Sequence, residues 1–76
     1  MSQKLPVVQS KDLVRVAQKL GFVMDRQRGS HAVYYRDRDR ARVVIPIHGG
    51  RDVPPGTLRD IIEDLGVTVD EFRALL

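Results

Sequence analysis

The sequence predicts an α+β fold in which a three-stranded antiparallel sheet has helices packed on one face, in the order α-β-β-β-α(-α). Three observations predict it. Apolar residues recur at helical spacing near both ends of the chain, the middle holds three short segments rich in strand-favouring residues, and the connections between those segments are short. Because the chain has 76 residues, we expect one domain over residues 1–76.

The first helix is predicted over about residues 10–20. Ser10 suits its N-cap, because a serine hydroxyl can accept a hydrogen bond from a free N–H of the first turn. The apolar stripe that follows consists of Leu13, Val14, Ala17 and Leu20. Gly21 is the expected end of the helix, since glycine adopts the left-handed conformation that ends helices.

Three strands are predicted next. They are expected over residues 22–27, 31–36 and 41–47, where aromatic and β-branched residues are frequent. Gly29-Ser30 separates the first from the second, and the polar residues 37–40 separate the second from the third. Such short connections favour an antiparallel meander.

Two further helices are predicted at the C-terminal end. Pro54-Pro55-Gly56-Thr57 opens the first, because proline suits a first helical turn, and Gly66 ends it. Its apolar stripe consists of Leu58, Ile61, Ile62 and Leu65. Thr68 and Glu71 then match a capping box, which predicts a short helix over about 69–75.

The charges are unevenly distributed along the chain. Residues 1–51 carry eleven Lys or Arg against four Asp or Glu, whereas residues 52–76 carry two against six, which gives +7 and −4 and the net +3. A cationic body attracts polyanions such as nucleic acid. Composition alone suits a solvated charged face equally well.

Several classes of protein are disfavoured by what the sequence lacks. It has no cysteine, so neither a disulfide framework nor a cysteine zinc site is expected. Residues 1–6 contain no long apolar run, which argues against a secretory signal, and no stretch approaches the ~20 apolar residues that cross a bilayer. We therefore expect a cytoplasmic protein.

His31 and His48 are the only histidines. Neither belongs to a metal-ligand pattern, so no metal is expected. The hydroxyl residues Ser10, Thr57 and Thr68 all resemble helix caps, and a Ser-His-Asp triad is therefore unsupported. No glycine-rich phosphate loop followed by Lys-Ser or Lys-Thr is present.

RNA cleavage requires fewer groups, because the ribose 2′-hydroxyl of RNA is itself a nucleophile. Histidine ordinarily titrates near pH 6.5, so His31 could act as general base or general acid. Arg26 and Arg28 lie just before it across a turn, and Arg36 follows on the same hairpin. The planar guanidinium fork suits phosphate better than a lysine ammonium does.

The residue types alone favour simpler roles. A histidine at the start of a strand is more often a surface or turn residue, and alternating Arg and Asp over residues 36–40 is typical of a solvated hairpin tip. Tyr34 and Tyr35 alternate across the second strand, so one is expected in the core. For the other, a core or surface role is favoured over stacking on a base.

Four segments in order carry a resemblance that changes this weighting. They are Leu20-Gly21-Phe22, Arg26-Gln27-Arg28-Gly29-Ser30-His31, Val44-Ile45-Pro46-Ile47-His48 and Pro54-Pro55-Gly56-Thr57-Leu58-Arg59-Asp60-Ile61-Ile62. From about Leu5 to Leu75, the chain resembles the HicA-type messenger-RNA interferase toxins of prokaryotic toxin–antitoxin pairs. The resemblance implies a fold like that of a double-stranded-RNA-binding domain, and an endoribonuclease that uses no metal or cofactor. It also implies mRNA and a HicB-type antitoxin as partners, with the antitoxin covering the active site.

The resemblance also assigns residues. The histidine after Gly-Ser is catalytic in the family, and here it is His31. We expect Arg26, Arg28, Ser30 and Arg36 to contact RNA. Many relatives carry further histidines or polar residues directly after the catalytic one, whereas Ala32 and Val33 follow it here. His48 is then a candidate for the second proton carrier or a phosphate contact, against a loop-packing role.

Two other functions compete with this one. A non-catalytic binder of double-stranded RNA would have the same fold. Several lysines at the start of the second helix would favour such a binder. The sequence instead has Arg59 beside Asp60 there. The other competitor is a protein-interaction module whose basic face binds an acidic partner.

Overall fold

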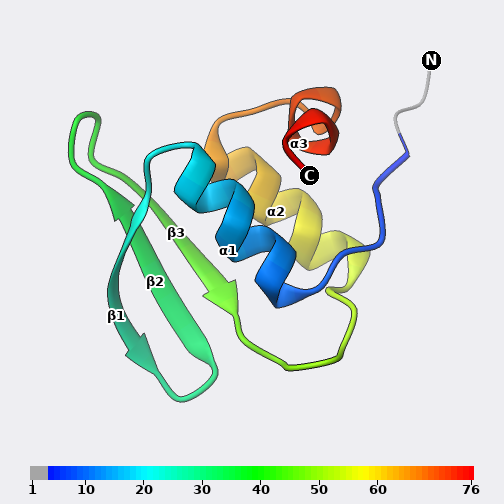
Figure 1. Ribbon diagram of the computed structural model, residues 1–76, viewed down its shortest axis with the longest axis horizontal. Helices are drawn as coiled ribbons and strands as arrows, with labels where there is room; N and C mark the ends of the chain where they lie inside the picture. Colours follow the sequence, from blue (N-terminus) through cyan, green and yellow to red (C-terminus); the bar gives the residue numbers. More distant parts are fainter. Residues whose placement is uncertain (1–3) are drawn as a thin grey trace.

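The structure, a computed structural model, describes residues 4–76. Residues 1–3, which belong to the predicted domain and to the segment examined for a secretory signal, lie outside that range. The predicted α-β-β-β-α-α order is confirmed (Figure 1). The elements are α1 Ser10–Lys19, β1 Val23–Arg28, β2 His31–Arg36, β3 Ala41–Pro46, α2 Pro55–Leu65 and α3 Val69–Leu75.

The three strands form one antiparallel sheet in the order β1-β2-β3. This meander is the predicted topology, and it places β2 between two edge strands. The register of β1 on β2 shifts between Met24 and Arg26, which marks a bulge at Asp25. The β2–β3 register runs without a break from His31 opposite Pro46 to Arg36 opposite Ala41.

The helices pack on one face of the sheet, as predicted. Helices α1 and α2 contact β3, α3 contacts α1, and Figure 1 shows the three helices gathered to one side of the sheet. Alternate strand residues meet them in the core, and these are Ala32, Tyr34, Val43 and Ile45. Tyr34 is therefore the core tyrosine that the alternation predicts, and Tyr35 belongs to the opposite, open face.

The buried stripe of α1 differs from the predicted one. Val16 is buried together with Leu13 and Ala17, whereas Val14 and Leu20 are only half-buried at the edge of the core. The reason is that α1 contacts both β3 and α3, so its buried arc is centred between these two neighbours. Across residues 4–76, no helix is long and apolar enough to cross a membrane.

Two of the three predicted helix caps are wrong. Gln9, not Ser10, is the N-cap of α1, and its backbone N–H donates to the Asp12 carboxylate at 2.9 Å. This hydrogen bond lowers the pKa of Asp12 below its ordinary value. Thr57 lies inside the first turn of α2, whose N-cap is Pro54. The Thr68 capping box is confirmed, because the Thr68 hydroxyl accepts from the Glu71 N–H and the Glu71 carboxylate accepts from the Thr68 N–H.

Candidate active site

His31 is the first residue of β2, and its side chain is exposed. The two-residue connection Gly29-Ser30 precedes it, and Gly29 has a φ of +53°. Ser30 does not share the positive φ, because Arg40 is the only non-glycine residue among 4–76 that has one. A hairpin connection with left-handed φ at its first position alone matches a type II′ turn, in which that position requires glycine. The turn thus ends directly at the imidazole-bearing residue.

Two hydrogen bonds hold this turn in place. The Gln27 side-chain amide donates to the carbonyl of Gly29 at 3.1 Å. The backbone N–H of Ile47, just beyond β3, donates to the carbonyl of Ser30 at 2.6 Å. The hairpin end is therefore attached to the end of β3, and the position of His31 is set relative to both neighbouring strands.

The register brings two of the predicted arginines to the open face beside His31. Arg28 is the direct cross-strand partner of His31, and Arg26 is opposite Val33. Cross-strand partners project to the same face of a sheet. Arg26, Arg28 and His31 therefore form one cluster on the face that the helices leave uncovered.

A pocket of about 470 Å³ opens beside His31. One wall consists of His31, Val44 and Pro46 from the open face, and the other consists of His48, Arg51, Asp52, Pro54 and Thr57 from the loop and the first turn of α2. The structure thus brings the two histidines of the chain to one pocket, because His31 begins β2 opposite Pro46 and His48 follows the end of β3 by two residues. Two imidazoles and a guanidinium around one cavity can provide a proton acceptor, a proton donor and a cation.

The loop that carries His48 is attached to the body at several points. The hydroxyl of Ser10 donates to the carbonyl of Pro46 at 2.5 Å and accepts from the N–H of His48 at 3.1 Å. The N–H of Arg51 donates to the carbonyl of His48 at 3.2 Å, which closes a turn through Gly50 at a φ of +75°. Ser10 is only 6% exposed and is the one buried polar residue in the part of the chain that the structure describes.

Comparison with known proteins places the chain in a family. The family model of the HicA toxin of bacterial toxin–antitoxin systems matches residues 10–67 of the 76-residue chain. The chain belongs to the HicA toxin family. A comparison with curated proteins gives no significant match.

Membership of the HicA family confirms the resemblance found in the sequence and implies an antitoxin partner. The matched region begins at Ser10, which binds the His48 loop, and ends at Val67, just beyond α2. It therefore contains the whole sheet, the pocket and the helix that closes it. Within residues 4–76, no group of three or more His, Asp or Glu side chains is placed to hold a metal ion.

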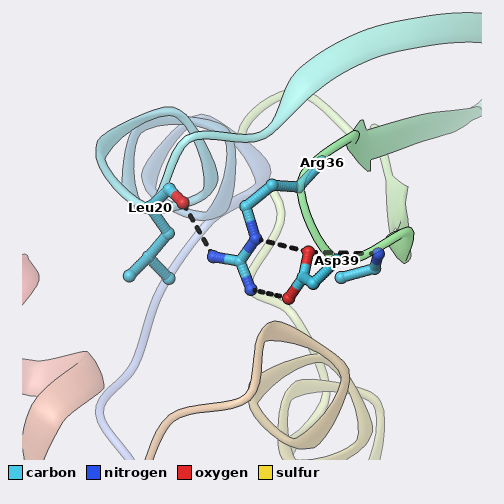
Figure 2. Close-up of polar contacts among 4 residues, drawn as sticks. Leu20, Arg36 and Asp39 are labelled. Atoms are coloured by element: carbon cyan, nitrogen blue, oxygen red, sulfur yellow. Dashed lines mark hydrogen bonds and ion pairs between the residues drawn. The ribbon is translucent and has the colours of Figure 1, made fainter.

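Arg36 lies apart from the other predicted RNA contacts of this HicA chain. It ends β2 on the helix-covered face, whereas His31 begins β2 on the open face. Figure 2 shows its guanidinium between the Leu20 carbonyl, which accepts at 2.8 Å, and the Asp39 carboxylate, which accepts at 3.0 and 2.8 Å. The guanidinium also lies 4.5 Å from the centroid of the Phe22 ring. Arg36 therefore links the hairpin to the end of α1, and its donors face protein groups.

Sequence reasoning missed three residues of this site. Arg51 and Thr57 line the pocket, yet the sequence predicted no site role for Arg51 and only a helix cap for Thr57. An arginine close after His48 in a glycine-containing loop was the available signal for the first. No local signal identifies Ser10, because its partners Pro46 and His48 are 36 and 38 residues away in the sequence.

Proposed function

We propose that this HicA-family chain is an mRNA endoribonuclease that needs no metal or cofactor, with His31 as its principal catalytic residue. The observation that supports the proposal best is the pocket that His31, His48 and Arg51 line together, beside the arginines of the open face. Family membership supports a toxin, and RNA is the substrate that a pair of imidazoles can cleave without further groups.

The proposed reaction is an in-line transfer on phosphorus. One imidazole takes the proton of the ribose 2′-hydroxyl, whose oxygen then forms a bond to phosphorus. The bond from phosphorus to the 5′-oxygen breaks, and the other imidazole, protonated at the start, gives its proton to that oxygen. The products are a 2′,3′-cyclic phosphate and a free 5′-hydroxyl. The charge that develops on the phosphoryl oxygens is stabilised by Arg28 and Arg51.

In this scheme His31 and His48 share the two proton transfers, and either can be the base. Arg26 binds a phosphate further along the RNA chain. The hydroxyl of Ser30, in the turn before His31, makes an uncharged contact with the RNA. Arg36 is left out of the proposed RNA contacts, because its donors are bound to Leu20 and Asp39. The presence of His31 and His48 at one pocket supports cleavage over simple duplex binding, because duplex binding requires no pair of imidazoles.

A HicB-type antitoxin is the proposed protein partner. This chain and the antitoxin would both act in the cytoplasm, where mRNA is translated. Family membership implies an antitoxin. The cationic segment of residues 1–51, which contains the whole sheet, suits an antitoxin that presents carboxylates to the open face. Such a partner would cover His31 and compete with RNA.

The test is cleavage of a purified mRNA in excess chelator by the wild-type protein and by His31→Ala. We expect full activity with chelator, loss of at least ~10²-fold in His31→Ala, and products ending in a cyclic phosphate. A substrate with a 2′-deoxy sugar at the cleaved position should not react. Cleavage that requires a divalent ion, or that His31→Ala retains, would refute this mechanism.

A further inference from the structure

The open face of the sheet combines arginines with apolar and aromatic side chains. The side chains that the register places on it are Val23, Arg26, Arg28, His31, Val33, Tyr35, Arg42, Val44 and Pro46. None of these positions carries a carboxylate, and the bulge residue Asp25 has no register partner. A face of this composition complements a polyanion that also exposes apolar surface.

Tyr35 is the aromatic residue of this face. It is half-buried, and its cross-strand partners are Val23 on one side and Arg42 on the other. It follows His31 and Val33 at every second position of β2, which places it about 13 Å from His31 along the strand. Sheets that bind single-stranded nucleic acid use such rings to stack bases, with cations nearby for the phosphates.

We propose that the open face binds single-stranded RNA, which runs along β2 with one base stacked on Tyr35 while the cleaved phosphate occupies the His31 pocket. Arg42 binds a phosphate next to the stacked base. This inference rests on the proposed function, because the pocket is what places the cleaved phosphate. Tyr35 then acts as a binding residue remote from the reacting atoms, and it selects for RNA whose bases are unpaired at that position.

The composition of the face favours a single strand over a duplex. A duplex presents phosphates and sugars, so it would cover Tyr35 and Val44 without giving them an apolar partner. Val44 is 39% exposed, and this side chain gains a contact only if a base or sugar lies flat on the sheet. Unpaired bases supply that contact, and every base has a ring face that can stack.

The test measures RNA affinity in a background that does not cleave. His31→Ala protein is titrated with a fluorescein-labelled single-stranded RNA, and the dissociation constant is read from fluorescence anisotropy. Tyr35→Ala should raise Kd about 5-fold or more, and Tyr35→Phe should not, because the ring alone stacks. Should Tyr35→Ala unfold, Tyr35→Leu keeps the apolar bulk without the ring and should show the same loss.

One further variant and two matched controls separate this surface from general electrostatics. Arg42→Ala should weaken binding and reduce the slope of log Kd against log salt by about 0.7. Arg59→Ala removes an exposed arginine from α2, off the open face, and should change neither quantity. Tyr34→Phe alters the neighbouring core tyrosine and should bind RNA as the parent does.

The same RNA annealed to its complement should bind more weakly than the single strand. The proposal is overturned if the duplex binds at least as tightly, if Tyr35→Ala binds like the parent, or if Arg59→Ala is the more damaging variant. The proposed function is tested separately, by comparing cleavage rates. It fails if the wild-type protein and His31→Ala cleave RNA equally fast. A Tyr35-dependent affinity in that case would leave the single-strand surface standing without its catalytic role.

Discussion

The hydroxyl of Ser10 accepts a hydrogen bond from the backbone N–H of His48 at 3.1 Å, across 38 residues of sequence. The same hydroxyl donates to the carbonyl of Pro46. One buried side chain at the start of α1 therefore holds both the end of β3 and the beginning of the loop that carries a proposed proton carrier. Ser10 is a positioning residue, because it acts on the pocket through His48.

Ser10→Ala should destabilise the protein and reduce cleavage together. Loss of the two hydrogen bonds leaves a partly buried carbonyl and N–H without this partner, which costs about 1–3 kcal/mol of the free energy of unfolding. The loop then moves, and the pH–rate profile of cleavage should change in the limb that His48 governs. Urea unfolding measures the first effect and cleavage kinetics the second.

Val14→Ala is the matched control for Ser10→Ala. Val14 lies in the same helix and is half-buried, so its truncation lowers stability by about 1 kcal/mol. It makes no hydrogen bond to the loop. If both variants lose activity only in proportion to their stability, the positioning role of Ser10 is disproved.

His48→Ala should slow cleavage by at least ~10²-fold, because one of the two proton transfers loses its carrier. The wild-type rate should follow a bell-shaped dependence on pH, and the variant should keep only the limb that belongs to His31. Single-turnover rates from pH 5 to 9 measure both. A full bell in His48→Ala would remove this residue from the proton transfers and leave it a role in loop packing.

Arg51→Ala should lower kcat/KM by about 10²-fold, as expected when a cation that stabilises transition-state charge is removed. Arg51→Lys should recover part of the loss, since it keeps the charge without the fork. The control is Arg38→Ala, which removes an exposed arginine from the β2–β3 connection. Equal losses in Arg51→Ala and Arg38→Ala would indicate only the general attraction of RNA to a cationic protein.

Arg36→Ala should affect stability rather than RNA affinity. The variant loses the hydrogen bond to Leu20 and the contact with the Phe22 ring, which together contribute about 2 kcal/mol. Its Kd for RNA, measured well below the melting temperature, should remain that of the parent. A weaker affinity with unchanged stability would instead support the RNA contact that the sequence predicted.

The Arg36–Asp39 pair should also make stability depend on pH. The hydrogen bonds from the Arg36 guanidinium, with a further one from the Ala41 N–H, lower the pKa of the Asp39 carboxyl. A lowered pKa means that the stabilisation is fully present above the ordinary carboxyl value, near 3.9, and is lost as the pH falls through the lowered one. The Tm of wild type should therefore exceed that of Asp39→Asn at pH 6, and the difference should shrink as the pH falls below the ordinary carboxyl value. A constant difference would contradict this linkage.

Local patterns predicted the elements well, because their causes are local. The stripe of α2, the Thr68–Glu71 cap and the two-residue connection before His31 each depend on residues a few positions apart. The cross-strand neighbours could be predicted from the short connections, because these favour antiparallel pairing of consecutive strands in a meander. His31 between arginines could therefore be predicted from sequence.

Contacts between distant segments could not be predicted in this way. Ser10 matched an N-cap locally, and only the nearby Pro46 carbonyl gives its hydroxyl a different partner. Arg36 looked like the other arginines of the hairpin, and only the closeness of Leu20 and Phe22 shows that it serves the fold.

By itself, the sequence determined the element order, the antiparallel sheet and the position of His31 beside Arg26 and Arg28. The tertiary structure alone decided which second group joins them, because His48 reaches the His31 pocket through a loop whose path is set by Ser10 of α1. It also decided which tyrosine faces outward, since the side of the sheet that the helices cover depends on packing across the whole chain. Periodicity specifies that two faces exist, and burial of the helical stripes selects between them.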